Sequence, residues 1–252
     1  MNNRYGTLAS WVYNLDKPVG CSFGDVEYYR ARLASCQGPV LEPAVGNGRF
    51  LVPMLEAGLA VEGFDPSEEM LAHCRSHEKV RAFDESLTCQ RFETFSYDRR
   101  FEAIVIPLGS FQLITEFSVA MSVLRRFHHH LAPNGRLMVD LDPIGGFLDP
   151  GSAVRSWTTE EADVLTLTDQ RIETDFVAQT TVSQHRYERW REGRLVETER
   201  ELFSLRWWGV AEFSMALGAA GFVDVVASGN YQYGRAPQRT DDTISFEARR
   251  PA

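Results

Sequence analysis

The ten residues LEPAVGNGRF, numbered 41–50, are the stretch that decides how this chain folds. They lie between a short apolar run predicted as a strand and a segment with helical spacing. Gly46 and Gly48 let the backbone turn tightly and come close to a ligand. A helix that begins directly after such a loop presents unpaired N–H groups to an anionic group. The stretch therefore predicts a ligand-binding loop within an α/β sheet.

The nature of the ligand is indicated by residues on either side of the glycines. Seventeen residues beyond Gly48, a predicted strand ends in Asp65, where a carboxylate can accept hydrogen bonds from both hydroxyls of a ribose. NAD is disfavoured because Leu51 replaces the third glycine of G-x-G-x-x-G and because Glu42 would repel a diphosphate. Glu42 suits an ammonium group instead. S-adenosylmethionine combines an amino acid with a nucleoside, so it is the favoured ligand.

The hydrophobic pattern divides the chain into two regions with different periodicity. From residue 39 to 142, short apolar runs alternate with helical segments, which is typical of a parallel sheet covered by helices. The segments 162–168, 180–190 and 194–207 are instead long strands rich in Thr, Val, Trp and charge. Such polar-faced strands do not suit a parallel core. They predict an antiparallel layer that covers one end of the domain or forms a dimer interface. A homodimer is therefore one of the two alternatives.

Composition narrows the class of protein. A formal net charge of -9 over 252 residues disfavours nucleic acid as a partner, because binding it needs a basic surface. No apolar run approaches the ~20 residues of a membrane span, and the start lacks the apolar stretch of a signal peptide. The four cysteines form no C-x-x-C pair, and the consecutive histidines 128–130 point in different directions on a helix, so no metal site is expected. These features predict a cytoplasmic protein with a small-molecule substrate and no membrane partner.

Three segments together resemble the successive motifs of class I S-adenosylmethionine-dependent methyltransferases: 42–48, 64–71 and 131–137. The resemblance extends over 39–142 and, more weakly, over the tail from Trp207. It implies an α/β, Rossmann-like, doubly wound fold with a mostly parallel seven-stranded sheet, helices on both faces and an inserted antiparallel β layer. The predicted organisation is a single methyltransferase-like domain (1–252) made of an N-terminal helical lid (1–36), a cofactor-binding core (37–150), the β insertion or cap (151–207) and a C-terminal helix with the last core strands (208–252).

The resemblance also implies which residues hold the cofactor. In that family the glycine loop contacts the methionine part, the acidic residue that ends the second strand binds ribose, and residues after the second and third strands surround adenine. Ala44 stands where the family usually has its first glycine. The predicted cofactor-binding residues are Glu42, Ala44, Gly46, Asn47 and Gly48 in the loop, Asp65, Pro66 and Met70 after the second strand, Phe92 and Glu93 after the third, and Pro107 and Leu108 after the fourth.

Candidates for the reaction come from the lid and the cap. The leader 11–18 resembles the segment that folds over the cofactor in related methyltransferases, and Trp11 with Tyr13 could pack against the sulfonium. Methyl transfer is an in-line displacement that needs alignment, and a base only for some acceptors. The predicted catalytic residues are Tyr13, Gln112 and Tyr187; Asp140, Asp142 and His185 are further polar groups expected near the site.

Three functions remain open from the sequence. The favoured one is a small-molecule methyltransferase that releases S-adenosylhomocysteine. The second is a cyclase that turns S-adenosylmethionine on itself, releasing methylthioadenosine and forming azetidine-2-carboxylate. The third is a module that binds S-adenosylmethionine without catalysis. No constellation of residues in the sequence identifies the acceptor.

Overall fold

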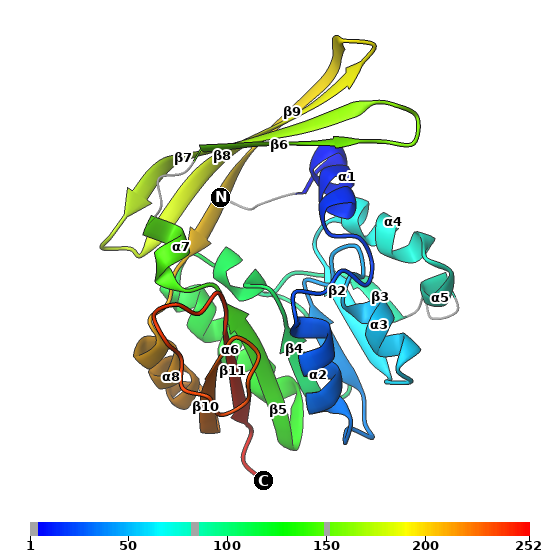
Figure 1. Ribbon diagram of the computed structural model, residues 1–252. Coiled ribbons are helices and arrows are strands. Elements are labelled where there is room, and N and C mark those ends of the chain that lie inside the picture. Colours follow the sequence, from blue (N-terminus) through cyan, green and yellow to red (C-terminus); the bar gives the residue numbers. More distant parts are fainter. Residues whose placement is uncertain (1–4, 82–85, 149–151) are drawn as a thin grey trace.

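The computed structural model describes residues 5–81, 86–148 and 152–252. Figure 1 shows two sheets: a central one with helices on both faces, here called the core sheet, and a second one above it, here called the cap sheet. Helix α1 (Thr7–Asp16) lies between them. In the described part of the chain, no helix is long and apolar enough to cross a membrane.

The core sheet has seven strands in the order β10-β11-β5-β4-β1-β2-β3. Only β11 runs against its neighbours, β5 and β10, while the other pairs are parallel. This confirms the predicted mostly parallel, doubly wound fold. The strands are β1 (Val40–Pro43), β2 (Val61–Asp65), β3 (Leu87–Cys89), β4 (Phe101–Ile106), β5 (Leu131–Leu141), β10 (Val223–Gly229) and β11 (Ile244–Arg249).

Apolar side chains on both faces of the core sheet hold the helices. Along β4, Ile104 and Ile106 belong to one buried cluster, whereas Ala103 and Val105 belong to the other. A strand that is buried on both faces reads as a continuous apolar run, as this one does. The helices are α2 (Asp25–Leu33), α3 (Leu51–Glu56), α4 (Glu68–Ser76), α5 (Glu78–Arg81), the 3-10 helix η2 (Ser110–Leu113), α6 (Phe117–His130), α7 (Ile144–Leu148) and α8 (Val210–Ala219).

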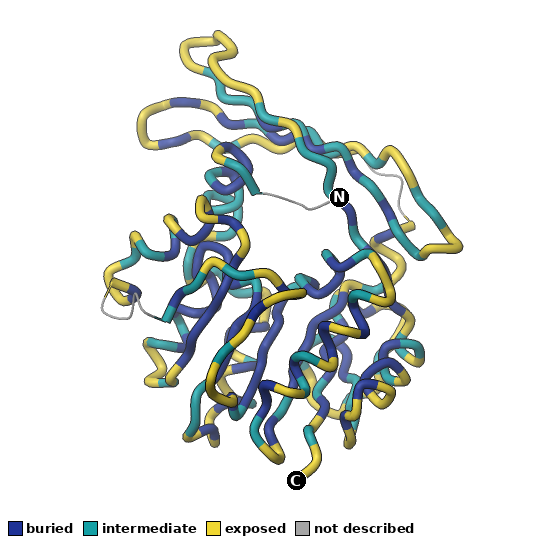
Figure 2. Tube along the Cα trace, turned by 180° about the vertical axis from the view of Figure 1, so that it is seen from behind, coloured by how far each residue is buried: buried dark blue, intermediate teal, exposed yellow. Residues whose placement is uncertain are grey.

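The cap sheet confirms the predicted antiparallel layer. Its strands pair in the order β6-β7-β8-β9, and every pair is antiparallel. They are β6 (Ser152–Thr158), β7 (Val164–Asp175), β8 (Thr180–Arg191) and β9 (Arg194–Arg206). The sequence did not predict β6, because six of its seven residues are exposed and carry no alternating pattern. Figure 2 shows the long hairpins of this sheet exposed at their ends, in contrast to the buried core strands.

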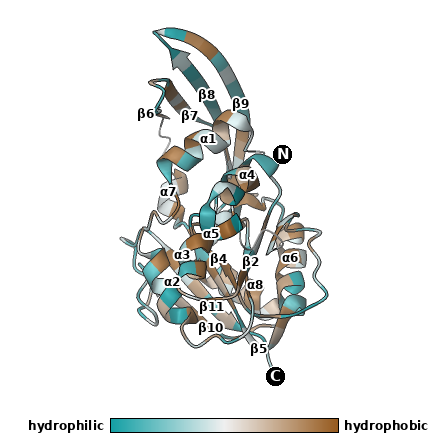
Figure 3. Cartoon of the chain, turned by 90° about the vertical axis from the view of Figure 1, so that its right-hand side faces the viewer, coloured by the Kyte–Doolittle hydropathy of each residue, from teal (hydrophilic) through white to brown (hydrophobic). Residues whose placement is uncertain are grey.

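The lid helix α1 packs its apolar face onto the cap sheet. Leu8 and Val12 form a buried cluster with Leu165, Leu167 and Tyr187 of the cap strands. Figure 3 shows the same helix between the cap strands and α4 of the core. Residues from the start of the chain thus separate the cap from the core.

Candidate functional site

The loop after β1 follows a left-handed path that favours glycine. The φ angles are +58° at Gly46 and +82° at Gly48. A Cβ at Gly48 would lie 2.7 Å from Cys74 Sγ of α4, and one at Gly46 would lie 3.1 Å from Met70 Cε. The glycines therefore let the loop pack directly on α4. Ala44 adopts the same conformation with φ 56°, which an L-residue does at a cost.

Asp65, at the end of β2, fixes this loop. Its Oδ2 accepts a hydrogen bond from Gly46 N at 3.0 Å, and its Oδ1 accepts one from Ser67 N at 2.9 Å. Burial raises the pKa of Asp65 to about 6, while the two N–H donors oppose that shift. The carboxylate therefore links the glycine loop to the start of α4, where Ser67 is the N-cap residue and its Oγ accepts a hydrogen bond from Met70 N.

Five of the predicted cofactor residues line one cavity, here called the core cavity: Ala44, Asp65, Pro66, Phe92 and Glu93. Most of its wall is apolar, with carboxylates among the lining groups, which suits an aromatic base attached to a hydroxylated sugar. The other lining residues are Tyr5, Arg91, Leu113 and Ile114. Segments from five places in the sequence therefore meet at the carboxyl edge of the parallel strands.

The environment of the Glu42 carboxylate shows whether the ammonium group of an amino acid fits beside the loop. The side chain is buried on β1, and its Oε2 has no hydrogen-bond partner among the described residues. Burial raises the pKa of Glu42 well above its ordinary value, and nearby Arg49 lowers it by a smaller amount. A buried carboxylate oxygen without a partner is costly unless a donor or cation reaches it. The residues present therefore fit S-adenosylmethionine.

Two other predicted cofactor residues, one in α4 and one in the loop, support the glycine loop from outside the core cavity. Met70 is buried under the loop at Gly46. Asn47 is fully buried, and its Nδ2 donates to Asn14 Oδ1 and to Lys17 O, both at 2.9 Å. The amide of Asn47 thus ties the glycine loop to the N-terminal segment.

The connection after β4 lies next to Asp140. Leu108 has φ 49°, and its N–H donates to Asp140 Oδ2 at 3.1 Å. Asp140 is fully buried and also accepts from Tyr29, Tyr231 and Ser245. With both oxygens occupied, Asp140 holds the backbone after Pro107 in place and has no direct access to a ligand.

Trp11 lies on the cap side of the lid. Its ring packs with the apolar cluster of α1 and the cap, and the guanidinium carbon of Arg189 is 5.2 Å from its centroid. Trp11 does not line the core cavity. The structure thus places Trp11 against the cap sheet and outside the core cavity.

A second cavity, here called the cap cavity, lies between the lid helix and the cap sheet, with a volume of about 240 Å³. One wall comes from alternate residues of the cap strands, because these face the same side of the sheet. Tyr5 lines both the cap cavity and the core cavity, so the two adjoin. The lining residues are Tyr5, Ala9, Val12, Tyr13, Asp16 and Lys17 near the start of the chain, and Arg155, Leu167, Asp169, Arg171, Thr181, Ser183, His185, Tyr187, Phe203 and Leu205 from the cap.

The structure brings together two of the three predicted catalytic residues. Tyr13 and Tyr187 both line the cap cavity, with His185. Burial raises the pKa of Tyr13 to about 12, while Arg49 lowers it and the Glu42 and Asp65 carboxylates raise it further. Tyr13 is therefore electrostatically coupled to the residues of the glycine loop.

Gln112 takes a different position from these tyrosines. It is fully buried, its Nε2 donates to Asp142 O at 3.2 Å, and its Oε1 accepts from Asp142 N at 2.8 Å. Its amide is paired with this backbone on both sides, so Gln112 positions the segment after β5 and does not reach toward the cap cavity.

The cap sheet provides the N-terminal cap of the lid helix. Glu199 of β9 accepts from Leu8 N at 2.9 Å and from Ala9 N at 3.3 Å, and these N–H groups have no partner within the helix. A Cβ at Gly6 would lie 2.7 Å from Glu199 Oε1, so a glycine makes room for the carboxylate. Asp16, at the other end of α1, pairs with Arg155 of β6 at 2.9 Å. Lid and cap are therefore joined at both ends of the helix.

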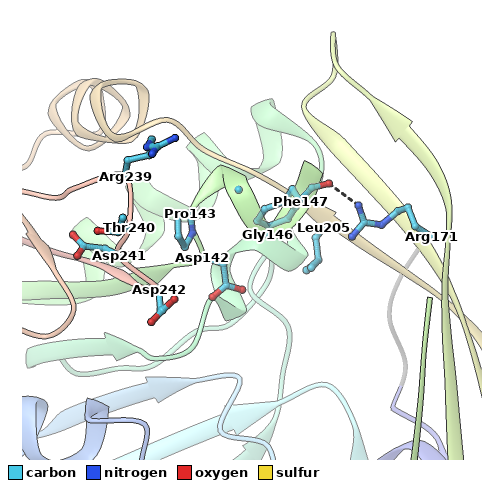
Figure 4. Close-up of a pocket in the computed structure, with 11 residues that line it drawn as sticks. Asp142, Pro143, Gly146, Phe147, Arg171, Leu205, Arg239, Thr240, Asp241 and Asp242 are labelled. Carbon is cyan, nitrogen blue, oxygen red and sulfur yellow. Dashed lines mark hydrogen bonds between the residues drawn. The ribbon is translucent and has the colours of Figure 1, made fainter. Parts of the chain in front are cut away.

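A third cavity, of about 450 Å³, opens beside the cap cavity and is here called the outer cavity (Figure 4). Arg171 and Leu205 line both cavities. Arg171 of β7 spans the gap to the core, where its Nη1 donates to Phe147 O of α7 at 2.7 Å. The other lining residues are Asp142, Pro143, Gly145, Gly146, Arg239, Thr240, Asp241 and Asp242.

Some residues of the site carried no signal in the sequence. Tyr5 precedes every recognisable motif, yet it lines two cavities. Asp169 and Glu199 lie in polar strands whose register decides which side chains face inward. In the structure, the buried Thr181, Ser183, His185 and Tyr187 alternate with less buried residues along β8.

Comparison with known proteins agrees with this geometry. Residues 40–135 match a family model described as a methyltransferase domain. YqeM of Bacillus subtilis (strain 168), named provisionally as a methyltransferase, is 29% identical over 107 residues, which cover 42% of each protein. This sequence match thus spans less than half the length of that relative.

Solved structures match over nearly the whole chain. The sugar N-methyltransferase KedS8 from Streptoalloteichus sp ATCC 53650 has a TM-score of 0.76 and 17% identity, covering 100% of this chain and 96% of that one. CalS10, an amino pentose methyltransferase from Micromonospora echinaspora solved with S-adenosylmethionine bound, has a TM-score of 0.70 and 18% identity, covering 99% of each chain. At these identities the likeness shows the fold, which includes the cap.

Proposed function

The chain has the fold of class I S-adenosylmethionine-dependent methyltransferases and their domain signature over 40–135, and from this premise we propose that it methylates an amine on a polar small molecule of amino-sugar type. The observation that carries the proposal is the pair of adjoining cavities. The core cavity contains the predicted nucleoside residues, and the cap cavity beside it has room for a second molecule. The choice of an amine as the acceptor group is supported by the structural similarity to the sugar N-methyltransferase KedS8 and the amino pentose methyltransferase CalS10.

The roles of the side chains follow from their places. S-adenosylmethionine, when bound, supplies a methyl group on a positively charged sulfur. Glu42 offers its unpaired oxygen to the amino acid ammonium, and Asp65 offers its carboxylate to the ribose hydroxyls. Tyr5 and Tyr13 close the site from the lid, which excludes water and restricts the acceptor to an aligned approach.

The size of the second site favours transfer to an acceptor over the two rival functions. A cyclase needs no second substrate, whereas here about 240 Å³ of polar-lined space adjoins the core cavity, and the outer cavity extends it past Arg171. A module that only binds the cofactor has no use for that space either. A sugar carrying a further substituent would therefore have a place in the outer cavity.

Mass spectrometry of the products tests the proposal. The protein is incubated with S-adenosylmethionine alone and then with a panel of amino sugars and their hydroxyl parents. We expect S-adenosylhomocysteine to form only when an amino sugar is present. Methylthioadenosine formed without any acceptor would replace the proposal with the cyclase, and binding without either product would replace it with the binding module.

A further inference from the structure

A row of polar side chains crosses the cap sheet on the face that lines the cap cavity. Asp169 of β7, His185 of β8 and Glu201 of β9 are paired directly across the three strands. Tyr187 lies two residues further along β8, on the same face. Side chains of directly paired residues lie within ~6 Å of each other. The register therefore gathers groups that are far apart in the sequence.

The imidazole of His185 is held between a phenol and a carboxylate. Its Nδ1 is 3.2 Å from Tyr187 Oη, and its Nε2 is 3.5 Å from Asp169 Oδ1. That carboxylate oxygen has no hydrogen-bond partner among the described residues. The ring of Phe203 stacks on the imidazole, with 4.7 Å between centroids, and His185 is only 8% exposed. The ring is therefore fixed in place beside the cavity.

We propose that Tyr187, His185 and Asp169 form a proton relay that prepares the acceptor amine, an inference that rests on the proposed function. An amine enters as an ammonium ion, whose nitrogen has no free electron pair. Tyr187 Oη takes one proton from that nitrogen as its own hydroxyl proton passes to His185 Nδ1. The electron pair of the broken N–H bond stays on nitrogen, and Asp169 faces the Nε2–H of the imidazolium. When the N–C bond then forms, the C–S bond breaks and its electron pair goes to sulfur.

The electrostatics of the cavity explain why the proton has to pass beyond Tyr187. Burial raises the pKa of Tyr187 far above its ordinary value, and the Glu201 and Glu199 carboxylates raise it further, so the phenol does not remain ionised. Imidazole is the side chain that commonly exchanges protons near neutral pH. The other titratable or charged groups around His185 are Glu199 and Glu201 of β9, Arg171 of β7, Arg155 of β6, and Tyr5, Tyr13, Asp16 and Lys17 on the lid side.

Nuclear magnetic resonance of the histidine ring nitrogens tests the relay in the protein saturated with S-adenosylhomocysteine. The probes are methyl 3-amino-3-deoxy-α-D-glucopyranoside and its parent methyl α-D-glucopyranoside, whose binding is measured by calorimetry. The protein has six histidines, and the signals of His185 are assigned as those that are missing from the spectrum of His185→Gln. If that variant does not fold, the contact with the Phe203 ring identifies them. We expect the amine, and not the glucoside, to move the His185 nitrogens toward imidazolium.

Matched variants separate a relay from a structural role. Tyr187→Phe keeps the ring but removes the hydroxyl, so the amine should still bind while the His185 signals stay in place. His73→Gln, on α4 of the core, should leave the movement intact. The relay is overturned if His185 does not respond to bound amine, if the response persists in Tyr187→Phe, or if the amine does not bind. Failure to bind S-adenosylhomocysteine would instead refute the proposed function.

Discussion

The core cavity and the cap cavity adjoin at Tyr5 but are built in different ways. Residues of the core cavity follow the ends of parallel strands, which the topology brings to one edge of the sheet. Residues of the cap cavity come from alternate positions on antiparallel strands and from a helix at the other end of the chain. A linear motif can therefore mark the first site, whereas the second exists only once strand register and lid packing are known.

The largest effect is expected at the core cavity, from Asp65→Asn. The change keeps the size of the side chain but removes an acceptor from a buried group that bonds to Gly46 N and Ser67 N. Lost hydrogen bonds to a charged group cost about 1 to 3 kcal/mol, so affinity for S-adenosylhomocysteine should fall by roughly tenfold or more. Calorimetry measures this, with Glu78→Gln on α5 as the control. An unchanged affinity would place the ribose elsewhere.

The same difference between the two cavities explains which site residues could be predicted from the sequence. Asp65 was predicted from the end of a strand, and the family resemblance implied Ala44, Pro66, Phe92 and Glu93. The structure gathers all five in one cavity. Gln112 also follows a strand, but its hydrogen-bond partner Asp142 lies 30 residues away along the chain. Only the fold shows that both polar atoms of the Gln112 amide are hydrogen-bonded to the Asp142 backbone.

Residues of the lid and cap were harder to predict for a physical reason. The leader 11–18 was expected to cover the cofactor, yet a helix turns successive side chains in different directions. Tyr13 lines the cap cavity, while the ring of Trp11 lies against Arg189 of the cap. The antiparallel layer itself was predicted from its polar strands, but which of its residues face inward depends on pairing that no local pattern fixed, as for Asp169.

A second prediction sharpens the description of the core cavity through Glu42. Burial raises the pKa of Glu42 well above its ordinary value, so this carboxyl binds a proton at a higher pH than an exposed glutamate does. An arriving ammonium favours the ionised form, so binding should release up to about one proton, and affinity should weaken as the pH falls. Calorimetry of S-adenosylhomocysteine in buffers of different ionisation enthalpy counts the protons.

The matched variant for this prediction is Glu42→Gln, which keeps the shape and removes the titrating group. It should abolish most of the proton release and weaken binding, whereas Glu78→Gln should change neither. Equal proton release from Glu42→Gln and the unmodified protein would assign the proton to another group. Asp65, with its pKa raised to about 6, would then be the next to examine.

A third prediction tests whether the lid and cap affect cofactor binding in the core cavity. Glu199→Ala removes the cap of the lid helix from a strand remote from the core cavity. Loss of a helix N-cap costs about 1 kcal/mol, which corresponds to about a fivefold weaker affinity for S-adenosylhomocysteine if the lid closes the site. Hydrogen exchange at Leu8 and Ala9 should rise at the same time.

Glu197→Ala serves as the control for that variant, because Glu197 is exposed and contacts Arg189 only at 3.9 Å. It should leave both affinity and exchange unchanged. If Glu199→Ala speeds exchange in α1 without weakening binding, the lid and cofactor site are independent. The two cavities would then be neighbours without coupling.

The smallest effect is expected at Ala44, which tests whether the glycine loop is under strain. A left-handed φ costs an L-residue about 1 to 2 kcal/mol, whereas glycine adopts it freely but loses about 0.5 to 1 kcal/mol through its more flexible unfolded state. Ala44→Gly should therefore raise the melting temperature by at most a few degrees, with less than a twofold change in affinity for S-adenosylhomocysteine. Ala72→Gly, at an exposed position inside α4, should instead lower it, because glycine costs about 1 kcal/mol within a helix. Opposite signs for the two substitutions would show that φ at position 44 constrains the residue there. If both variants were destabilised equally, the alanine would be contributing packing in the core cavity that outweighs its strain.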